Sequence, residues 1–547
     1  MKNLSYANGP CSCALRGETV GEALYRTVEQ YGDREALVVV EQGYRATYKQ
    51  LWEQTTALAK AIMAVGIKKG DRVGIWSANR YEWVLTQFAT ARVGAIMVNI
   101  NPGYKLEGVE YALKQSEINL LITAQGFKKT DYIDMLNTIR PHCPYPQRTV
   151  ILDRNWEKFL ELGKSISNEE LAEREASLDF DEPINIQYTS GTTGQPKGAT
   201  LTHHNILNNG FFIGEGQRLT EQDRVCIPVP FYHCFGMVLG NMAVVTHGAC
   251  MVIPGEVFEA ELVMRTVQDE KCTSLYGVPT MFIAELAHPN FSKYNFSTLR
   301  TGIMAGSLCP IDTMEQVINK MNMKEVTICY GMTETSPVSA QTMYNDPIDK
   351  RTSTVGKVHP HLELKIVDPQ TGKIVPRGER GELCTRGYSV MLGYWNDEAA
   401  TKKAIDKNGW MHTGDVAVMD EDGYFAIVGR IKDIIIRGGE NISPKEIEDF
   451  LIKHEGIQDV QVIGVPSEKY GEEVMAWVKR QPGFDYGEEE LLRYCKGRIA
   501  TFKIPRYWKF VDEFPMTVTG KIRKVDMRKI AAEELGLDKL KSIHTED

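Results

Sequence analysis

The residues best suited to bind phosphate lie in one short stretch, YTSGTTGQPKGAT, at positions 188–200. It combines three glycines, four threonines, one serine and one lysine. Glycines let backbone N–H groups turn toward an anion, and the hydroxyls and the ammonium add further donors. The stretch therefore predicts a phosphate-binding loop, although clusters of Gly, Ser and Thr are also common in flexible turns.

This stretch differs from the GxxxxGK[ST] phosphate loop. Lys197 follows Pro196 instead of a glycine, and Gly198 stands where that motif has a magnesium-binding hydroxyl. Residues 184–188 read as a short strand, and the segment that begins at His203 has helical spacing, so we expect the loop at a strand-to-helix turn. The residues by themselves indicate either a phosphate loop of another kind or a flexible turn.

The length and the charge of the chain restrict its class. A chain of 547 residues predicts roughly three or four structural units of about 150 residues each. The net charge of −9 argues against a nucleic-acid-binding protein, because a long basic stripe is missing. The eleven cysteines are scattered, with only Cys11 and Cys13 close together. Two such residues are too few for a zinc site, and the scatter suits a reducing, cytoplasmic location.

No integral membrane segment is expected. The first twenty residues lack the apolar core of a signal peptide. Residues 225–255 contain no Asp, Glu, Lys or Arg and are long enough to span a bilayer. However, Pro228, Pro230 and His247 interrupt this segment, which reads as strand, helix and strand. A buried α/β core is the favoured interpretation.

The order of the expected elements indicates an α/β fold. Helical and strand patterns alternate through the first half, which is typical of βαβ units and of a parallel sheet covered by helices. Residues 355–393 read as short strands with Pro and Gly turns, and so as a small β-rich subdomain. After Gly429 a compact tail begins, with a helix capped by Ser443 and started by Pro444. Its length of about 115 residues suits one small α+β domain.

Four further stretches join the glycine-rich loop in a recognisable set. They are YGMTET (330–335), RGYSVMLGYW (386–395), the long segment GWMHTGDV…SPKEIE (409–448) and PMTVTGKIRK (515–524). Together they resemble, in the expected order, the signature motifs of the adenylate-forming superfamily, which includes acyl-CoA synthetases, peptide-synthetase adenylation domains and beetle luciferases. The stretches EPINIQYTSGTTG, VPFYHCFG and YGVPTMF are most similar to fatty acyl-CoA synthetases of the medium-chain type.

The resemblance implies a division of the chain into domains. The large N-terminal AMP-binding domain would span residues 1–430, with parallel-sheet αβ subdomains and a small β-barrel-like subdomain at about 350–430. A hinge at 431–433 would connect it to a small, mobile α+β domain at 434–547. In this family the small domain rotates between the two steps of the reaction.

The implied reaction activates a carboxylic acid. A carboxylate is a poor electrophile, so the family first forms an acyl-adenylate from ATP with release of pyrophosphate, and a thiol then displaces AMP. Charge gathers between the carboxylate and the α-phosphate, which requires fixed donors and Mg²⁺. CoA is the favoured thiol because no carrier module is fused to the chain, and transfer to a separate carrier protein stays as an alternative.

The resemblance assigns the phosphate contacts residue by residue. Glu334 would bind Mg²⁺, and Thr333 would contact the α-phosphate. Without the motif, Glu334 would be read as a solvated surface residue. The β- and γ-phosphates would be held by the loop residues Thr189, Ser190, Gly191, Thr192, Thr193, Gly194 and Lys197.

The resemblance also assigns the adenosine contacts. Tyr330 would stack on adenine, Asp415 would accept hydrogen bonds from both ribose hydroxyls, and Arg430 would add a ribose or phosphate contact. Asp415 and Arg430 could instead cap a loop or form an ion pair. Neighbouring contacts would come from Gly306, Ser307, Gly331 and Met332.

Four further positions belong to the moving parts of the family. Lys521 would bridge the substrate carboxylate and the α-phosphate, and Lys432 would be the hinge pivot. Gly438 and Gly439 would let the pantetheine arm of CoA pass close to the backbone. His233 would lie between the acyl pocket and the thiol path, although a lone histidine among apolar residues is more often a core residue.

The expected acyl pocket is apolar. Its candidate segments, FYHCFGMVLG, YGVPTMF, GIMAGS and TSPVSA, contain no Arg or Lys for a second carboxylate and no Asp for an amino group. A fatty acid of medium length follows from the resemblance. A peptide-synthetase-like adenylation enzyme and a non-catalytic nucleotide sensor are the rival interpretations, and the sequence indicates no oligomeric state.

We expect Lys521→Ala to slow acyl-adenylate formation by about a hundredfold, because it removes a fixed charge from the first transition state. Thioester formation from supplied acyl-adenylate should be largely spared. Pyrophosphate release measures the first step, and CoA-dependent AMP release from the supplied adenylate measures the second. Equal loss of both steps would contradict the assigned role.

Overall fold

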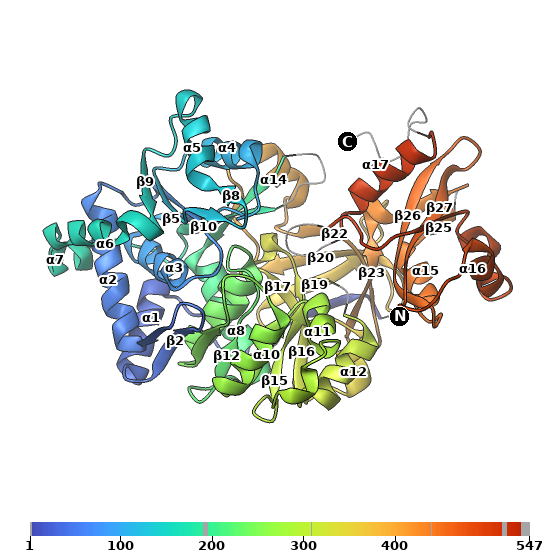
Figure 1. Ribbon diagram of the computed structural model, residues 1–547, viewed down its shortest axis with the longest axis horizontal. Helices are drawn as coiled ribbons and strands as arrows, with labels where there is room; N and C mark the ends of the chain where they lie inside the picture. Colours follow the sequence, from blue (N-terminus) through green and yellow to red (C-terminus); the bar gives the residue numbers. More distant parts are fainter. Residues whose placement is uncertain (1–2, 190–194, 308, 439, 517–521, 538–547) are drawn as a thin grey trace.

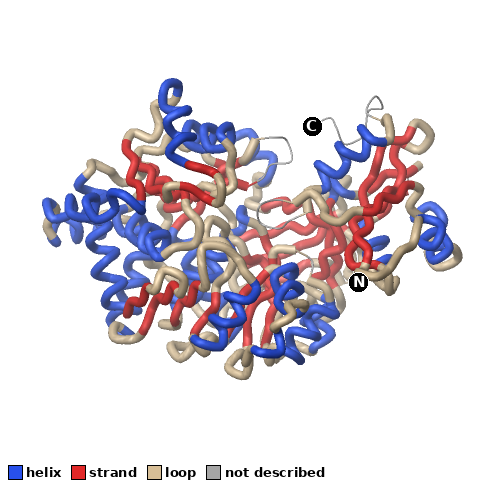
Figure 2. Tube along the Cα trace, in the orientation of Figure 1, coloured by secondary structure: helices blue, strands red, loops and turns tan. Residues whose placement is uncertain are grey.

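The computed structural model describes residues 3–189, 195–307, 309–438, 440–516 and 522–537. The chain forms a large lobe and a smaller lobe, and the smaller one contains the elements from β24 (Ile435–Arg437) onward (Figure 1). In the large lobe, helices surround the strands of two sheets, and a third sheet lies toward the small lobe (Figure 2). The architecture is the expected α/β fold.

The first sheet carries the glycine-rich loop at one side. Its inner pairs, β10–β5, β5–β4, β4–β6 and β6–β9, are parallel, whereas β10–β11 and β11–β21 are antiparallel. Its strands in spatial order are β21 (Gly393–Tyr394), β11 (Lys197–Thr202), β10 (Pro183–Thr189), β5 (Ile96–Asn99), β4 (Arg72–Trp76), β6 (Leu120–Thr123) and β9 (Arg148–Ile151).

The second sheet supplies the YGMTET segment. Its central strands are parallel, and antiparallel strands flank them at both edges. In spatial order they are β18 (Lys357–Val358), β17 (Val338–Gln341), β16 (Glu325–Gly331), β15 (Thr301–Ala305), β14 (Ser274–Gly277), β12 (Arg224–Cys226), β13 (Cys250–Ile253), β2 (Glu35–Val39) and β3 (Tyr44–Thr47).

Helices with apolar surfaces fill the space between these two sheets. All residues of α3 from Glu82 to Val93 are buried, so the helix has no solvent face. The largest apolar core joins both sheets to four helices, α1 (Val20–Tyr31), α2 (Tyr48–Ala64), α3 (Tyr81–Val93) and α8 (His203–Gln217). This shared core fixes the positions of the two sheets relative to each other.

The third sheet is antiparallel and includes the expected β-rich segment. The early strand β1 lies at one edge, which the sequence patterns did not indicate, and β23 lies at the other edge. In spatial order its strands are β1 (Tyr6–Asn8), β19 (Leu362–Val367), β20 (Gly381–Gly387), β22 (Met411–Met419) and β23 (Phe425–Arg430).

The small lobe packs helices on a mostly antiparallel sheet. Its strands are β25 (Glu440–Ile442), β24, β27 (Gly471–Arg480), β26 (Ile457–Ser467) and β28 (Tyr507–Phe510), and its helices are α15 (Pro444–Leu451), α16 (Glu488–Cys495) and α17 (Lys524–Glu534). The expected hinge at 431–433 coincides with a 3₁₀ turn between β23 and β24. Its role as a pivot stays a prediction.

One sequence prediction about local structure is wrong, and a second is confirmed only in part. The glycine-rich loop does not lead directly into a helix, because β11 follows it and pairs back on β10 before α8 begins. The two apolar side chains of β11, Ala199 and Leu201, were too weak a signal to be read as a strand. Ser443 is the N-cap residue of α15 and Pro444 begins the helix, as expected, but the Ser443 hydroxyl makes no capping hydrogen bond and donates instead to the carbonyl of Val428 on β23, at 2.8 Å.

The apolar segment 225–255 is part of the core. It forms β12, a π-helix at Phe235–Met242, the short helix α9 (Ala243–Thr246) and β13. The helices of the described ranges are all too short or too polar to cross a bilayer. The prediction of a buried α/β segment is confirmed.

A buried arginine connects three helices of the large lobe. The guanidinium of Arg92 in α3 lies 3.4 Å from the ring centroid of Trp52 in α2 and donates to Glu175 of α7 (Asn168–Ala176), at 2.6 Å. It also donates to the hydroxyls of Thr55 and Thr56, at 3.0 and 2.8 Å. Only 2% of this side chain is exposed.

We therefore expect Arg92→Ala to lower the stability of the large lobe by about 3 kcal/mol, because it leaves buried acceptors unpaired and opens a cavity. Urea unfolding followed by tryptophan fluorescence measures the change. Lys164→Ala is the control, because that ion pair with Glu161 is 73% exposed on the lysine side. A midpoint that stayed at the wild-type value in Arg92→Ala would contradict the expectation.

Candidate active site

The glycine-rich loop closes the hairpin of β10 and β11. Thr189 and Lys197 are paired across this hairpin. The hydroxyl of Thr189 lies 3.4 Å from the carbonyl oxygen of Lys197 and 3.4 Å from Oε1 of Glu334. The hairpin therefore places the two described ends of the loop beside the carboxylate of the YGMTET segment. Five predicted phosphate ligands of the loop, Ser190, Gly191, Thr192, Thr193 and Gly194, lie outside the described residues.

Glu334 is a buried carboxylate at the point where three segments meet. It lies in a 3₁₀ turn at Thr333–Thr335, directly after β16, and is 6% exposed. The phenol of Tyr394 donates to its Oε1 at 2.8 Å. Burial and the adjacent carboxylate raise the pKa of Tyr394, so that its proton stays on the phenol and is available to Glu334.

Tyr394 is a site residue that sequence reasoning missed. It lies on β21 beside Ala199 of β11, and the ammonium of Lys197 lies 5.2 Å from its ring centroid. Its position within RGYSVMLGYW was the available signal. However, aromatic residues in such segments usually belong to the core, and only the spatial pairing of β21 with β11 shows its contact with Glu334.

Backbone contacts fix the YGMTET segment in place. A Cβ atom on Gly331 would lie 1.6 Å from the carbonyl oxygen of Pro337, so this close approach requires glycine. The hydroxyl of Thr335 donates to the Pro337 carbonyl at 2.7 Å, and the N–H of Met391 donates to the Glu334 carbonyl at 2.9 Å. These contacts thus fix the main chain from which the Glu334 side chain projects.

A second polar group lies at the start of the same segment. Tyr330 donates from its phenol to Oδ2 of Asp415 at 2.7 Å, and Nε of Arg430 lies 3.2 Å from Oδ1. Asp415 is 8% exposed. Burial raises the pKa of Asp415, although Arg430 and the Tyr330 hydrogen bond act in the opposite direction.

The predicted adenine contacts lie at neighbouring strand ends. β15 and β16 are parallel, with Ala305 opposite Cys329, so Gly306 and Tyr330 leave the sheet at the same edge. Gly306 adopts a φ of +91°, and both it and Ser307 are exposed. The carboxyl ends of parallel strands are the usual place for a ligand in α/β folds.

Other predicted residues lie outside these two groups. His233 precedes the π-helix, and its neighbour Cys234 donates to the side chain of Gln187 on β10 at 3.2 Å. Lys432 is half-buried in the 3₁₀ turn after β23; burial, and then the adjacent Arg430, lower its pKa. The role of Lys432 as the hinge pivot stays a prediction. The role of His233 between the acyl pocket and the thiol path also stays a prediction.

The last predicted positions belong to the small lobe. Gly438 has a φ of +59°, and its N–H donates to the carbonyl of Tyr470 at 2.8 Å. Gly439 and Lys521 lie outside the described residues.

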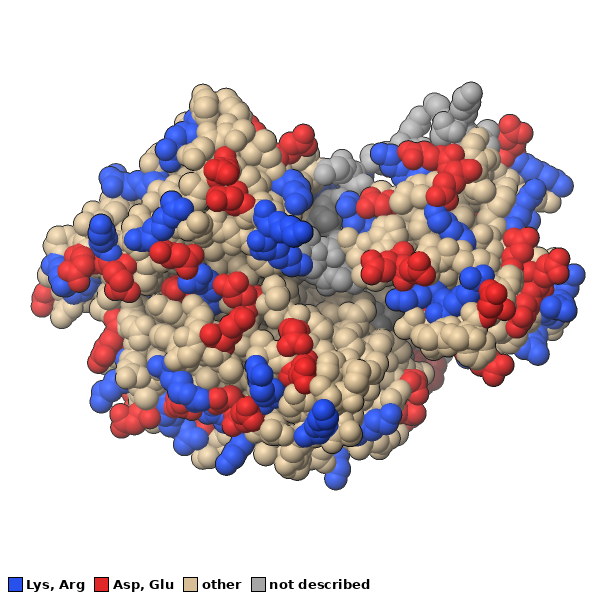
Figure 3. All heavy atoms as spheres, in the orientation of Figure 1, with Lys and Arg blue, Asp and Glu red and all other residues tan. Residues whose placement is uncertain are grey.

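The surface is hollowed between the two lobes, and acidic and basic side chains are interspersed on the face shown in Figure 3.

Comparison with known proteins identifies the family. The model of the AMP-binding enzyme family matches residues 24–395, and the model of its C-terminal domain matches residues 446–521. YngI of Bacillus subtilis (strain 168) is 50% identical over 539 residues, which cover 95% of this chain and 98% of that protein. Mitochondrial medium-chain acyl-CoA ligase ACSF2 of Danio rerio is 44% identical, over 97% of this chain and 91% of its own.

Solved structures of related enzymes have the same fold. ATP-bound MatB from Rhodopseudomonas palustris aligns with a TM-score of 0.82 at 27% identity, over 94% of this chain and 99% of its own. The anthranilate CoA ligase AuaEII, in complex with anthranoyl-AMP, aligns with a TM-score of 0.82 at 26% identity, over 96% of this chain and 99% of its own. The chain therefore belongs to the AMP-binding enzyme family of the adenylate-forming superfamily, as an enzyme of the AMP-forming acyl-CoA synthetase type.

Proposed function

We propose that the protein is a fatty acid–CoA ligase with a preference for medium-chain acids. It would activate the acid with Mg-ATP to an acyl-adenylate, release pyrophosphate, and then transfer the acyl group to CoA with release of AMP. The observation that carries the proposal is the 3.4 Å contact of the Thr189 hydroxyl with Glu334, since Thr189 is also paired with Lys197 across the hairpin that holds the glycine-rich loop. Tyr330 and Asp415 lie at the other end of the YGMTET segment, which suits the adenosine part of the same nucleotide.

The chain offers a suitable ligand for Mg²⁺. Oε1 of Glu334 is occupied by the Tyr394 phenol and the Thr189 hydroxyl, while a carboxylate has a second oxygen that can bind a cation. Magnesium commonly takes one or two carboxylates and completes its shell with phosphate oxygens and water. When bound, it would neutralise charge on the phosphates. Tyr394 donates a hydrogen bond to the carboxylate, and the ammonium of Lys197 lies 5.2 Å from the ring centroid of Tyr394.

The adenosine end would exchange its present partners for the nucleotide. Asp415 accepts one hydrogen bond from Tyr330 and pairs with Arg430, so each of its oxygens is already directed by a donor. A ribose diol presents two donors at a similar spacing and can replace them. Arg430 is 57% exposed and can move to a phosphate or ribose oxygen.

The second step would depend on rotation of the small lobe. Lys521 would act in adenylation and Gly438 with Gly439 in thioester formation. Polar contacts between the lobes support an interface that can open, such as the hydrogen bond from Ser443 to Val428 and the 3.9 Å pair of Arg380 with Glu446.

The preference for an apolar acid rests on the segments around His233. Phe231, Met237 and Val238 are fully buried, and the relatives that include ACSF2 are named medium-chain ligases. The alternative is a stand-alone adenylation enzyme that loads an acyl group onto a carrier protein.

Tyr394→Phe is expected to lower kcat/KM for pyrophosphate release by about tenfold and to raise the Mg²⁺ concentration needed for half-maximal rate, because Glu334 loses its orienting hydrogen bond. Tyr388→Phe is the matched control: Tyr388 belongs to the same motif, and its phenol contacts Asn209 at 3.4 Å. An unchanged Mg²⁺ dependence in Tyr394→Phe would remove Glu334 from the metal site.

The function itself is tested by AMP release from Mg-ATP across straight-chain fatty acids, aromatic acids and amino acids, each with and without CoA. We expect CoA-dependent turnover with a maximum at a medium chain length, because the segments around His233 are apolar and the ACSF2 relatives are named medium-chain ligases. Adenylation that ignores CoA, or that prefers amino acids, would instead favour the carrier-loading enzyme.

A further inference from the structure

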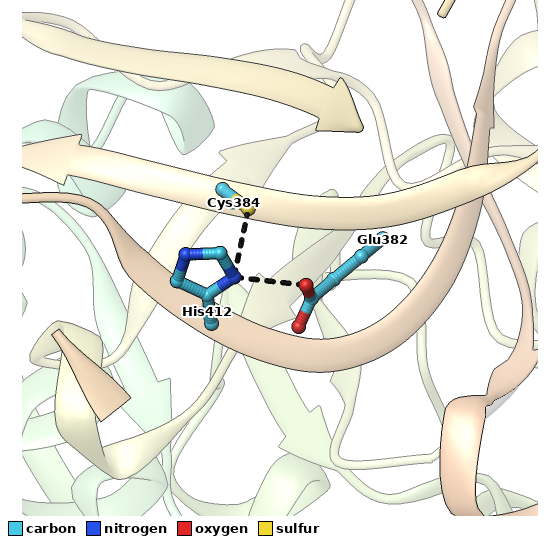
Figure 4. Close-up of side chains that lie close together, drawn as sticks. All are labelled: Glu382, Cys384 and His412. Atoms are coloured by element: carbon cyan, nitrogen blue, oxygen red, sulfur yellow. Dashed lines mark hydrogen bonds and ion pairs between the residues drawn. The ribbon is translucent and has the colours of Figure 1, made fainter. Parts of the chain in front are cut away.

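A cluster of three side chains that can bind a metal lies on the third, antiparallel sheet of the large lobe, outside the proposed nucleotide contacts. Glu382 and Cys384 are two residues apart on β20, and His412 lies opposite Cys384 on the adjacent strand β22. The three side chains point toward one another (Figure 4). The pairing has an irregularity between Glu382 and Cys384, which brings both side chains to the same imidazole.

The distances suit a small cation. Nδ1 of His412 lies 2.8 Å from Oε2 of Glu382 and 3.6 Å from Sγ of Cys384, and the ligand atoms of all three residues lie within 4.8 Å of one another. Ligand atoms around a tetrahedral zinc ion are about 3.4–3.8 Å apart, because the bonds are about 2.0–2.3 Å long. The thiol and the imidazole already have this spacing, and a small rotation of Glu382 would supply the third.

We propose that Glu382, Cys384 and His412 bind a divalent transition-metal ion, with Zn²⁺ as the preferred ion. A thiolate, an imidazole and a carboxylate together favour zinc over Mg²⁺ or Ca²⁺, which prefer oxygen ligands alone. Three protein ligands leave a fourth position for water. Cys384 is fully buried, while 35% of the His412 side chain is exposed, so an ion would enter from the imidazole side.

A second carboxylate, that of Asp406, lies on the far side of the imidazole. Nε2 of His412 lies 3.9 Å from Oδ2 of Asp406, and Oδ1 of Asp406 accepts backbone hydrogen bonds from Asn408 and Trp410. A carboxylate on the far nitrogen is the usual partner of a metal-bound histidine, because it directs the other nitrogen to the ion.

The site is joined to the strand that presents Asp415. The other oxygen of Glu382, Oε1, accepts a hydrogen bond from the N–H of Gly414 at 3.2 Å, and the N–H of Asp415 donates to Thr413 at 3.1 Å. An ion that draws Glu382 toward Cys384 therefore acts on the residue before Asp415. Zinc would then raise the KM for ATP. This effect on the KM rests on the proposed function, whereas the binding of zinc to the cluster does not rest on it.

Titration with Co²⁺ and with Zn²⁺ tests the site directly. The background carries Cys11→Ser and Cys13→Ser, because these two exposed thiols could bind an ion by themselves. We expect one Co²⁺ per chain with a thiolate-to-cobalt absorption band, and one Zn²⁺ in competition with a chromophoric chelator. Cys384→Ser should abolish the band and weaken Zn²⁺ binding by more than about tenfold.

Matched variants separate ligand loss from misfolding. Cys495→Ser removes a buried thiol of the small lobe and should retain the band and the Zn²⁺ affinity. His412→Asn and Glu382→Gln should each weaken Zn²⁺ binding, which gives a test that does not depend on Cys384→Ser folding. Cobalt binding without the thiolate band, or equal Zn²⁺ affinity in all ligand variants, would overturn the site. Zn²⁺ binding with an unchanged KM for ATP would overturn only its link to Asp415.

Discussion

The hydrogen bonds to the buried carboxylate of Glu334 are the contacts on which the nucleotide site depends. Tyr394 and Thr189 both direct protons at Oε1, and they come from strands of a different sheet from the strand that leads into Glu334. A buried carboxylate without such donors would be costly. The two parallel sheets must therefore keep their relative position for these hydrogen bonds, and for the proposed roles of Glu334 and Lys197, to be maintained.

The packed helices between the two sheets keep the relative position of the sheets fixed. The helix α3 is buried on every side, and the core it shares with α1, α2 and α8 leaves little freedom for one sheet to slide on the other. In contrast, polar contacts such as Ser443 to Val428 join the small lobe to the rest. A rigid nucleotide platform beside a lobe that is less firmly attached suits an enzyme that performs two successive reactions at one site.

The antiparallel sheet between the large core and the small lobe carries residues of two separate polar groups. It presents Asp415 to Tyr330, at the proposed adenosine end, and, three residues earlier on the same strand, His412 to the cluster with Glu382 and Cys384. Because Glu382 contacts both the imidazole and Gly414, the two groups share a carboxylate. A metal ion at the cluster would thus act on nucleotide binding through a strand, without a change in the large apolar core.

The sequence by itself determined the fold class and the family, because apolar periodicity and motif order are local properties that need no knowledge of contacts. It missed the strand β11 and the hydrogen bond from the Ser443 hydroxyl to Val428, since short strands of small residues and hydroxyl side chains have several equivalent local uses. Only the tertiary structure decided that Tyr394 holds Glu334 and that Cys384 meets His412. Those pairs are far apart in the chain, and the register of β-strands, which no local pattern encodes, brings them together.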